Sequence, residues 1–410
     1  MSRKRLTVMS EKAYIVGAKR SAIGTFMGSL KNVTPAEMGA TVLKAALEQA
    51  NVKPDQVNEV IIGNVISAGL GQNIARHISL DAGIPNTVPA HSLNMVCGSG
   101  LEAVIEATIR IHAGWGNIFV AGGVENMSAA PYLISGKNRQ GVKMGNQTVV
   151  DSMINDALTD AMNNVHMGVT AENIAKKYDI TREMQDEFAL ASQEKALAAI
   201  EAGKFKDEIV PIEVKERKKT IIFDTDEHPR KTSMELLGKL RPSFIKDGTV
   251  TAGNASGIND GASMCIVASE TAVKENNLKP IAEIIGCGQG GVDPLTMGLG
   301  PTPAILNALK DAGLTLDQMQ LIELNEAFAS QSLGVIHELI ENTGIDREAL
   351  MSVTNVNGGA IALGHPVGAS GNRILVSLLY EMQKRHLTYG LASLCIGGGM
   401  GVAVVVKMGE

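Results

Sequence analysis

Aromatic residues and long apolar runs are scarce in this chain of 410 residues. Phe, Tyr and Trp together make up 3% of it, and Trp occurs once. No run approaches the roughly 18 apolar residues that a membrane-spanning helix needs, so we expect no membrane association. The start of the chain is basic but lacks the apolar stretch of a secretory signal, which favours a cytoplasmic protein.

Cysteines are few, and basic residues are fewer than acidic ones. The four cysteines, Cys97, Cys265, Cys287 and Cys395, form no C-x-x-C pair, which argues against a disulfide scaffold or a zinc ribbon. Lys and Arg number 37 against 43 Asp and Glu, and the net charge of −6 argues against a nucleic-acid partner. We therefore expect individual, reduced thiols.

Glycine, by contrast, is abundant, with 44 copies, and 45% of the residues are hydrophobic. Strand-like apolar runs alternate with amphipathic helical runs near both ends of the chain, which is typical of βαβ units and an α/β fold. We predict a helix over 35–50 and strands over 12–17, 59–63, 117–122, 281–286, 320–324, 390–396 and 401–406.

The two ends of the chain resemble each other. The segments 59–63, 96–100 and 120–123 are matched, in the same order, by 321–325, 368–371 and 396–399. This order indicates an internal duplication of one α/β domain, although Gly-rich turns also resemble one another by chance. The stretch between the two ends is loopier and more charged, with Thr170 and Thr181 as candidate helix N-caps.

A cysteine stands just before a predicted helix. Cys97 precedes apolar residues at helical spacing in the segment 94–104, so its thiol is expected at a helix N-terminus. The positive field there favours the thiolate, and the flanking glycines let a substrate approach the backbone. A free cysteine is as often a small buried hydrophobe, so this segment alone leaves both interpretations open.

Three other polar residues stand at turns. His365 lies in a Gly-rich loop that is fixed by Pro366, a setting that more often positions a side chain than buries it. Cys395 precedes a run of glycines whose N–H groups could bind an oxyanion. Asn325 ends a predicted strand and is either a site residue or a helix cap. Together with Cys97 they suit acyl transfer, which needs a thiolate, a base and oxyanion donors.

These four segments, in this order and over the whole chain, resemble the thiolases, in particular the type that forms acetoacetyl-CoA. The most specific matches are the surroundings of Cys97, the Gly-His-Pro loop and the Cys-Ile-Gly-Gly-Gly turn. The resemblance implies an α/β thiolase fold, with two duplicated βαβ-type domains packed in αβαβα layers and an inserted CoA-binding loop domain. Placed on this chain, the N-terminal half is 1–130 completed by 256–280, the loop domain is 131–255, and the C-terminal half is 281–410.

The resemblance also implies a reaction, the reversible Claisen condensation of two acetyl-CoA molecules to acetoacetyl-CoA and CoA. Cys97, activated by His365, would take the acetyl group as a thioester, and Cys395 would remove an α-proton from the second acetyl-CoA. His365 and a water held by Asn325 would stabilise the enolate, while the N–H groups of Cys97 and Gly397 would bind the other oxyanion. No metal or redox cofactor is implied.

The CoA thioesters would bind through the central segment. Carried over residue by residue, Ser256 and Ala252 would meet the pantetheine, Leu158, His166, Met167, Phe244 and Phe328 would line its tunnel, and Arg230 would lie by the nucleotide. The range 204–246 holds 11 Lys and Arg against 8 Asp and Glu, which fits an anionic CoA but also a solvated face. The range 130–151 matches the arm of tetrameric relatives, which implies a homotetramer.

Several alternatives remain at this stage. A broader-range 3-ketoacyl-CoA thiolase of fatty-acid breakdown is the nearest, although Met167 would fill the space that a long acyl chain needs. A decarboxylating ketoacyl synthase would carry His where Cys395 stands, and a non-enzymatic CoA-binding relative would lack one of the reactive residues. A dehydrogenase would rest only on the G-x-G-x-x-G pattern at 286–291, but the following residues cannot open a helix directly.

Two departures from the family pattern lie near the predicted nucleophile. Met95 stands where the family mostly has Lys, and Glu102 where a basic or neutral residue is common. These departures put the electrostatics around Cys97 in question.

Overall fold

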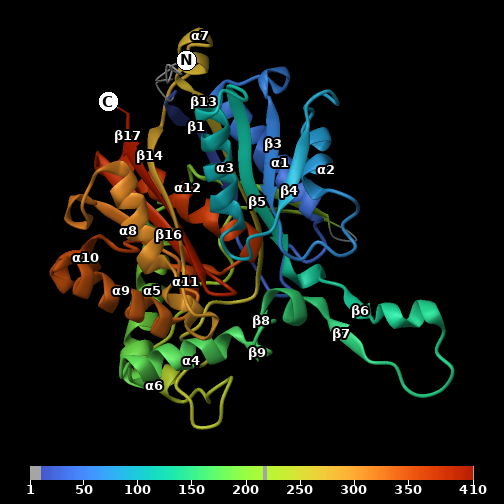
Figure 1. Ribbon diagram of the computed structural model, residues 1–410, viewed down its shortest axis with the longest axis vertical. Coiled ribbons are helices and arrows are strands. Elements are labelled where there is room, and N and C mark those ends of the chain that lie inside the picture. Colours follow the sequence, from blue (N-terminus) through green and yellow to red (C-terminus); the bar gives the residue numbers. More distant parts are fainter. Residues whose placement is uncertain (1–10, 216–218, 410) are drawn as a thin grey trace, which may run out of the picture.

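One large mixed sheet, with helices on both faces, forms the body of the molecule (Figure 1). This computed structural model describes residues 11–215 and 219–409, so the basic start of the chain lies outside the described residues. The alternation of strands and helices confirms the predicted α/β class.

The sheet runs in the order β15-β16-β17-β14-β1-β13-β5-β3-β4. The strands in this order are β1 (Ala13–Ser21), β3 (Glu59–Gly63), β4 (Ala90–Leu93), β5 (Ile118–Asn126), β13 (Asn259–Ser269), β14 (Ala282–Gly291), β15 (Leu321–Leu324), β16 (Tyr389–Ile396) and β17 (Met400–Met408). Each predicted strand range overlaps one of them. Two short strands of the same sheet, β2 (Gly24–Thr25) and β10 (Ile209–Val210), pair beside this order with β13 and β1. Pairing is parallel at the two outer ends of the sheet and antiparallel in its centre.

The sheet consists of two halves that β1 and β14 join over a short stretch. The helices α1 (Pro35–Ala50) and α2 (Ile74–Asp81) pack on the outer face of the first half. Between the halves lie α3 (Ser99–His112) and α12 (Val367–Arg385), while α8 (Pro301–Ala312) and α9 (Ala329–Thr343) cover the second half. This is the predicted αβαβα order.

The matched segments of the two halves meet in the middle layer. The unit β3–α3–β5 corresponds to the unit β15–α12–β16. The helices of the two units, α3 and α12, touch through glycines. A Cβ on Gly100 would lie 2.8 Å from the backbone N of Asn372, and one on Gly371 would lie 2.6 Å from the backbone N of Leu101. Because real Cβ atoms do not approach backbone so closely, α3 and α12 can meet only where both residues are glycine.

The G-x-G-x-x-G pattern lies inside β14, and no helix begins directly after it. A Cβ on Gly286 would lie 2.4 Å from Ala308 O, and one on Gly288 would lie 2.3 Å from Ala304 O. These glycines therefore let α8 approach the strand. The geometry is not that of a dinucleotide-binding turn, in which the last glycine opens a helix.

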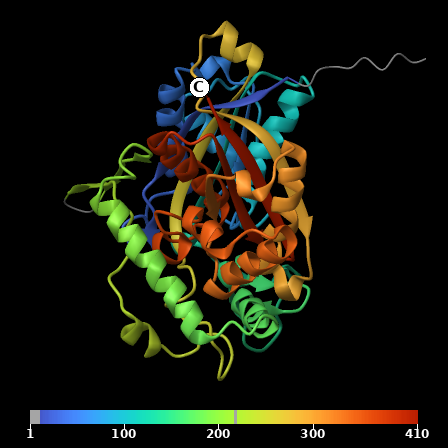
Figure 2. The same cartoon turned by 90° about the vertical axis from the view of Figure 1, so that its left-hand side faces the viewer.

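The central segment forms two parts outside the large sheet. A hairpin of β6 (Tyr132–Ile134) and β7 (Val149–Asp151) projects away from the sheet (Figure 1). The helices α4 (Met167–Lys177), α5 (Arg182–Glu201) and α6 (Met234–Gly238) gather at the C-terminal half, and Figure 2 shows α5 along its outside. No helix within 11–215 or 219–409 is long and apolar enough to span a membrane.

The two predicted helix caps have different outcomes. The Thr181 side chain accepts from Met184 N and begins α5, as predicted. The prediction for Thr170 was wrong, since this residue lies inside α4 and donates to Met167 O. The cap of α4 is His166, whose Nδ1 accepts from Gly168 N at 3.0 Å. An imidazole supplies the acceptor there that a threonine would otherwise provide.

Candidate active site

A pocket of about 390 Å³ brings together residues of both halves and of the central segment. Ten of the predicted site residues line it: Cys97, Leu158, His166, Met167, Arg230, Phe244, Ala252, Ser256, Phe328 and His365. The other three, Asn325, Cys395 and Gly397, do not line the pocket itself. Their surroundings are described below, after those of Cys97 and His365.

Cys97 sits on a tight turn between β4 and α3. The preceding residue, Val96, has φ of +47°, which is unusual for a β-branched side chain and marks local strain. Two polar side chains hold the turn. Asn94 Oδ1 accepts from Val96 N at 2.9 Å, and Ser99 Oγ accepts from Met95 N while it donates to Val96 O.

The thiol of Cys97 is harder to ionise than the sequence predicted. Burial raises its pKa to about 11, with a smaller contribution from the negative charge of Glu125, although the N–H groups of Gly397 and of Cys97 itself oppose the shift. The prediction of a thiolate favoured by the helix N-terminus was therefore wrong. Apolar walls deny the thiolate its solvation, and two N–H groups offset only part of that cost.

His365 is held as a neutral base with a defined tautomer. Ser370 Oγ donates to Pro366 O at 2.9 Å, so its single proton is used. The 2.5 Å contact between His365 Nδ1 and Ser370 Oγ must then be an N–H donation from the imidazole. Nε2 therefore carries the lone pair, and it has no hydrogen-bond partner among the described residues. Burial and the charge of Arg373 lower the pKa of His365 to about 3.

Cys395 and Gly397 lie at the end of β16, next to the turn that carries Cys97. Cys395 is fully buried, and burial raises its pKa well above the usual value, with a further contribution from the charge of Cys97. A Cβ on Gly397 would lie 3.4 Å from Met167 Sδ and from Val96 Cγ1. The Gly397 N–H also faces the sulfur of Cys97, so the turn after Cys395 meets the turn that carries Cys97.

Asn325 is buried at the end of β15, where its backbone N–H donates to Ser393 O on β16. It is not a helix cap, because α9 begins later and its N-cap is Phe328. Neither side-chain atom of Asn325 has a hydrogen-bond partner among the described residues. A buried amide without a partner is costly, so these atoms are suited to hold a water or a substrate atom.

Aromatic rings and a methionine form the walls of the pocket. The His166 ring stacks on Phe244 with centroids 4.7 Å apart, and Phe244 meets Phe328 edge-on at 6.1 Å. Met167, Met297 and Phe328 pack in one apolar cluster with Cys395. Such walls suit the slender, partly apolar arm of pantetheine.

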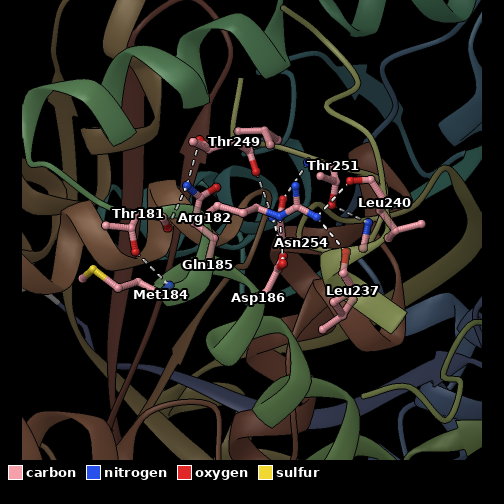
Figure 3. A network of polar contacts seen from close by, with 12 residues as sticks. Thr181, Arg182, Met184, Gln185, Asp186, Leu237, Leu240, Thr249, Thr251 and Asn254 are labelled. Carbon is pink, nitrogen blue, oxygen red and sulfur yellow. Dashed lines mark hydrogen bonds and ion pairs between the residues drawn. The ribbon is translucent and has the colours of Figure 1, made fainter. Parts of the chain in front are cut away.

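A polar network around Arg182, which we call the rim, holds the loop whose Ala252 and Ser256 line the pocket (Figure 3). Arg182 donates to Asp186 Oδ2 at 2.7 Å and to the carbonyl oxygens of Leu237 and Leu240. Asp186 Oδ1 accepts from Asn254 Nδ2 at 2.8 Å. The N-terminus of α5 thereby holds both the end of α6 and the loop that carries Ala252 and Ser256.

Arg230 belongs to the same rim and is tied to that loop. Its Nη2 donates to Ala252 O at 3.2 Å, and its backbone N–H donates to Gln193 Oε1 on α5. Its guanidinium supplies positive charge at the pocket.

Sequence reasoning missed several residues of the site. Thr25, His228 and Met297 line the pocket, and Ser370 orients His365. His228 had a local signal, because it stands two residues before Arg230. Thr25 comes from the first strands of the chain, and no local pattern relates it to the site. Within the described ranges, no three His, Cys, Asp or Glu side chains are grouped as metal ligands.

Comparisons with known proteins agree with this arrangement. Residues 13–271 match the family model described as thiolase, N-terminal domain, and residues 278–408 match that of the thiolase C-terminal domain. An acetyl-CoA acetyltransferase of Thiocystis violacea is 53% identical over 401 residues, which cover 97% of this chain and 100% of that protein.

Solved structures are similar as well. An acetyl-CoA acetyltransferase of Bacillus anthracis has a TM-score of 0.93 at 45% identity, over 97% of this chain and 99% of that one. Human mitochondrial 3-ketoacyl-CoA thiolase in complex with CoA has a TM-score of 0.91 at 45% identity, over 98% of each chain.

Proposed function

The chain belongs to the thiolase family, and we propose that it is an acetyl-CoA acetyltransferase, which reversibly condenses two acetyl-CoA molecules to acetoacetyl-CoA and CoA. One observation carries the proposal. A thiol, Cys97, and a neutral imidazole with a free Nε2, His365, face one pocket beside a second thiol, Cys395. This set supplies a nucleophile and two proton carriers.

In the first half-reaction, the sulfur of Cys97 attacks the thioester carbon of acetyl-CoA while His365 Nε2 accepts the thiol proton. Because burial keeps the thiol protonated, the attack of the sulfur is coupled to the transfer of its proton to His365. The N–H groups of Cys97 and Gly397 stabilise the oxyanion that forms. Cys395 gives its proton to the departing CoA sulfur, which leaves the protein with an acetylated Cys97 and a Cys395 thiolate.

The second half-reaction uses the Cys395 thiolate and the protonated His365 that the first half-reaction leaves. An acetylated Cys97 cannot ionise and so cannot oppose the charge of Cys395, and the Cys395 thiolate takes an α-proton from the second acetyl-CoA. Protonated His365 and a water held by the free Asn325 amide stabilise the enolate oxygen. The enolate attacks the acetyl group, and His365 returns its proton to the sulfur of Cys97.

CoA itself is expected to lie along the predicted residues of the central segment. Leu158, His166 and Phe244 would enclose the pantetheine, with Ala252 and Ser256 at the loop above it, and Arg230 would meet the anionic nucleotide. The distribution of apolar walls inside and a guanidinium at the rim supports this orientation.

The acyl chain is expected to be short. Met167 is buried, and its sulfur lies against the Gly397 turn beside Cys97 and Cys395, where the end of an acyl group would be. The broader-range 3-ketoacyl-CoA thiolase of fatty-acid breakdown is therefore the less favoured function.

Four sequence-based predictions remain part of the proposal: a homotetramer that uses the 130–151 arm, a cytoplasmic location, a reaction without a metal or redox cofactor, and the division into two halves and a loop domain. The projecting β6–β7 hairpin, with exposed Tyr132, Ile134 and Met144, supports the role of the arm.

Mass spectrometry of the protein after mixing with acetyl-CoA tests the function. We expect one acetyl group on the peptide that holds Cys97, and none in a Cys97→Ser variant, because a hydroxyl is far less ionised and less nucleophilic than a thiol. Thiolysis of acetoacetyl-CoA should exceed that of longer 3-ketoacyl-CoAs. An adduct on another residue, or faster turnover of malonyl-CoA than of acetyl-CoA, would overturn the assignment.

A further inference from the structure

A carboxylate that the reaction does not use is buried beneath the two reactive turns. Glu125 lies near the end of β5 and is fully buried. Among the described residues, no Lys or Arg forms an ion pair with it. Burial raises the pKa of Glu125 to about 7, although backbone hydrogen bonds oppose the shift. A buried acid without a cation needs its hydrogen bonds to be stable there.

Both oxygens of Glu125 accept hydrogen bonds, and the donors come from two segments. Oε1 accepts from Ile66 N at 3.1 Å and from Asn64 Nδ2 at 3.0 Å. Oε2 accepts from Val65 N and from Gly368 N, each at 3.0 Å. One side chain thus joins the loop after β3 to the first turn of α12.

The first segment leads to the nucleophile. The carbonyl of Val65 accepts from Asn94 Nδ2 at 3.4 Å, and Asn94 Oδ1 accepts from Val96 N. Asn94 therefore links the loop held by Glu125 to the strained turn that carries Cys97. Val65 and Cys97 also pack in the same apolar cluster.

The second segment leads to the base. Gly368 is the second residue of α12 and stands two residues before Ser370, which holds the His365 ring. A Cβ on Gly368 would lie 2.6 Å from Glu125 Oε2, so the backbone must come this close to the carboxylate. The first N–H groups of a helix have no partner within the helix, and Glu125 supplies one for Gly368.

We propose that Glu125 is a positioning residue that ties the turn of Cys97 to the turn of His365 and so sets the geometry between thiol and imidazole for acyl transfer. The inference rests on the proposed function of Cys97 as the acetylated nucleophile. It assigns Glu125 no contact with substrate and no proton transfer of its own.

Two variants test the inference. Glu125→Gln keeps the shape but turns an N–H₂ group toward two donors, and Glu125→Asp keeps the charge but cannot reach both segments. We expect both to acetylate Cys97 about tenfold to a hundredfold more slowly at saturating acetyl-CoA, since small misplacements of reacting groups have effects of this size. KM should stay within about twofold, because the pocket walls are untouched.

A matched control separates positioning from charge. Glu59→Gln removes a partly buried carboxylate at the start of β3, which bonds to His91 and Arg110 and to neither turn, and its acetylation rate should stay within about twofold of the wild type. Wild-type acetylation rates in either folded Glu125 variant would overturn the proposal. So would full rescue by Glu125→Asp, because only the charge would then matter.

If neither Glu125 variant folds, hydrogen exchange of the wild-type protein tests whether Glu125 anchors the two segments. The amides of Val65, Ile66 and Gly368 should be protected as strongly as those of β5, although a first-turn helix amide normally exchanges fast. Fast exchange at Gly368 would refute the anchoring. If wild-type Cys97 is not acetylated, the proposed function fails instead, and the exchange result still tests the anchor.

Discussion

The hydrogen bond between His365 and Ser370 allows a sharp test of how the base is prepared. In Ser370→Ala, the buried Nδ1–H loses its acceptor at 2.5 Å, and the hydroxyl that donated to Pro366 O disappears. The imidazole can then move its proton to Nε2, which removes the lone pair that must accept the proton of Cys97.

The size of the effect follows from that lost bond. Leaving a buried donor unpaired costs about 1–3 kcal/mol. If the loss falls on the transition state, the acetylation of Cys97 should slow by about five- to 150-fold, at about 1.4 kcal/mol per factor of ten. Binding of acetyl-CoA should change little, since Ser370 is fully buried and does not line the pocket.

Rapid-quench mass spectrometry of the acetylated peptide measures this rate, and ¹⁵N NMR of His365 reports the tautomer. Ser377→Ala is the matched control, because Ser377 is buried on the same helix and loses a comparable bond, to Glu208 at 2.9 Å, far along the helix from the base. Ser370→Thr should retain much of the rate. A Ser370→Ala rate within about twofold of the wild type, or an equal loss in Ser377→Ala, would refute the reasoning.

Four further outcomes are expected. Cys395→Ala should still be acetylated on Cys97, although more slowly because the departing CoA sulfur loses its proton donor, and it should stop deuterium washout from acetyl-CoA; washout at the wild-type rate would make His365 the base. Met167→Ala should raise thiolysis of a C6 substrate relative to C4 by about tenfold, and an unchanged ratio would show that Met167 does not set the limit. Asp186→Ala should raise KM for acetyl-CoA, because the rim loosens. The rate of acetylation by a truncated thioester such as S-acetyl-N-acetylcysteamine should not change, and an equal loss of activity with both thioesters would contradict the role of the rim. Alkylation of Cys97 by iodoacetamide should rise about tenfold per pH unit from pH 7 to 10, because the thiolate reacts and its pKa is about 11; a plateau near pH 8.5 would contradict this value.

Local signals were enough to predict the bounds of several helices and strands of the body. The helix over 35–50 has the predicted bounds, because Thr34 and Glu37 form a capping box and Pro35 opens the first turn. The strand over 59–63 is likewise unchanged. Such signals lie within a few residues of the boundary that they determine.

Signals of this kind could not reveal what depends on distant contacts. The helix N-terminus near Cys97 predicted an easily ionised thiol, but the walls that bury it come from other parts of the chain, and they raise its pKa instead. Glu125 and Gly368 are 243 positions apart, and no pattern near either residue predicts their bond. The proposed reactive residues stand in local motifs, whereas the contact of Glu125 with Gly368 exists only in the folded chain.

The contact between α3 and α12 through Gly100 and Gly371 bears on how heat should inactivate this protein. Backbone meets backbone there, so no side-chain rotamer can absorb a small separation of the two helices that directly follow the turns of Cys97 and His365. The reactive pair should keep its geometry until the whole core melts, and kcat should vanish together with the folded state. The rim depends largely on side-chain hydrogen bonds around Arg182 and Asp186, so the binding of CoA should weaken at a lower temperature than the one at which the core melts. On warming, KM should therefore rise at a lower temperature than the one at which kcat falls.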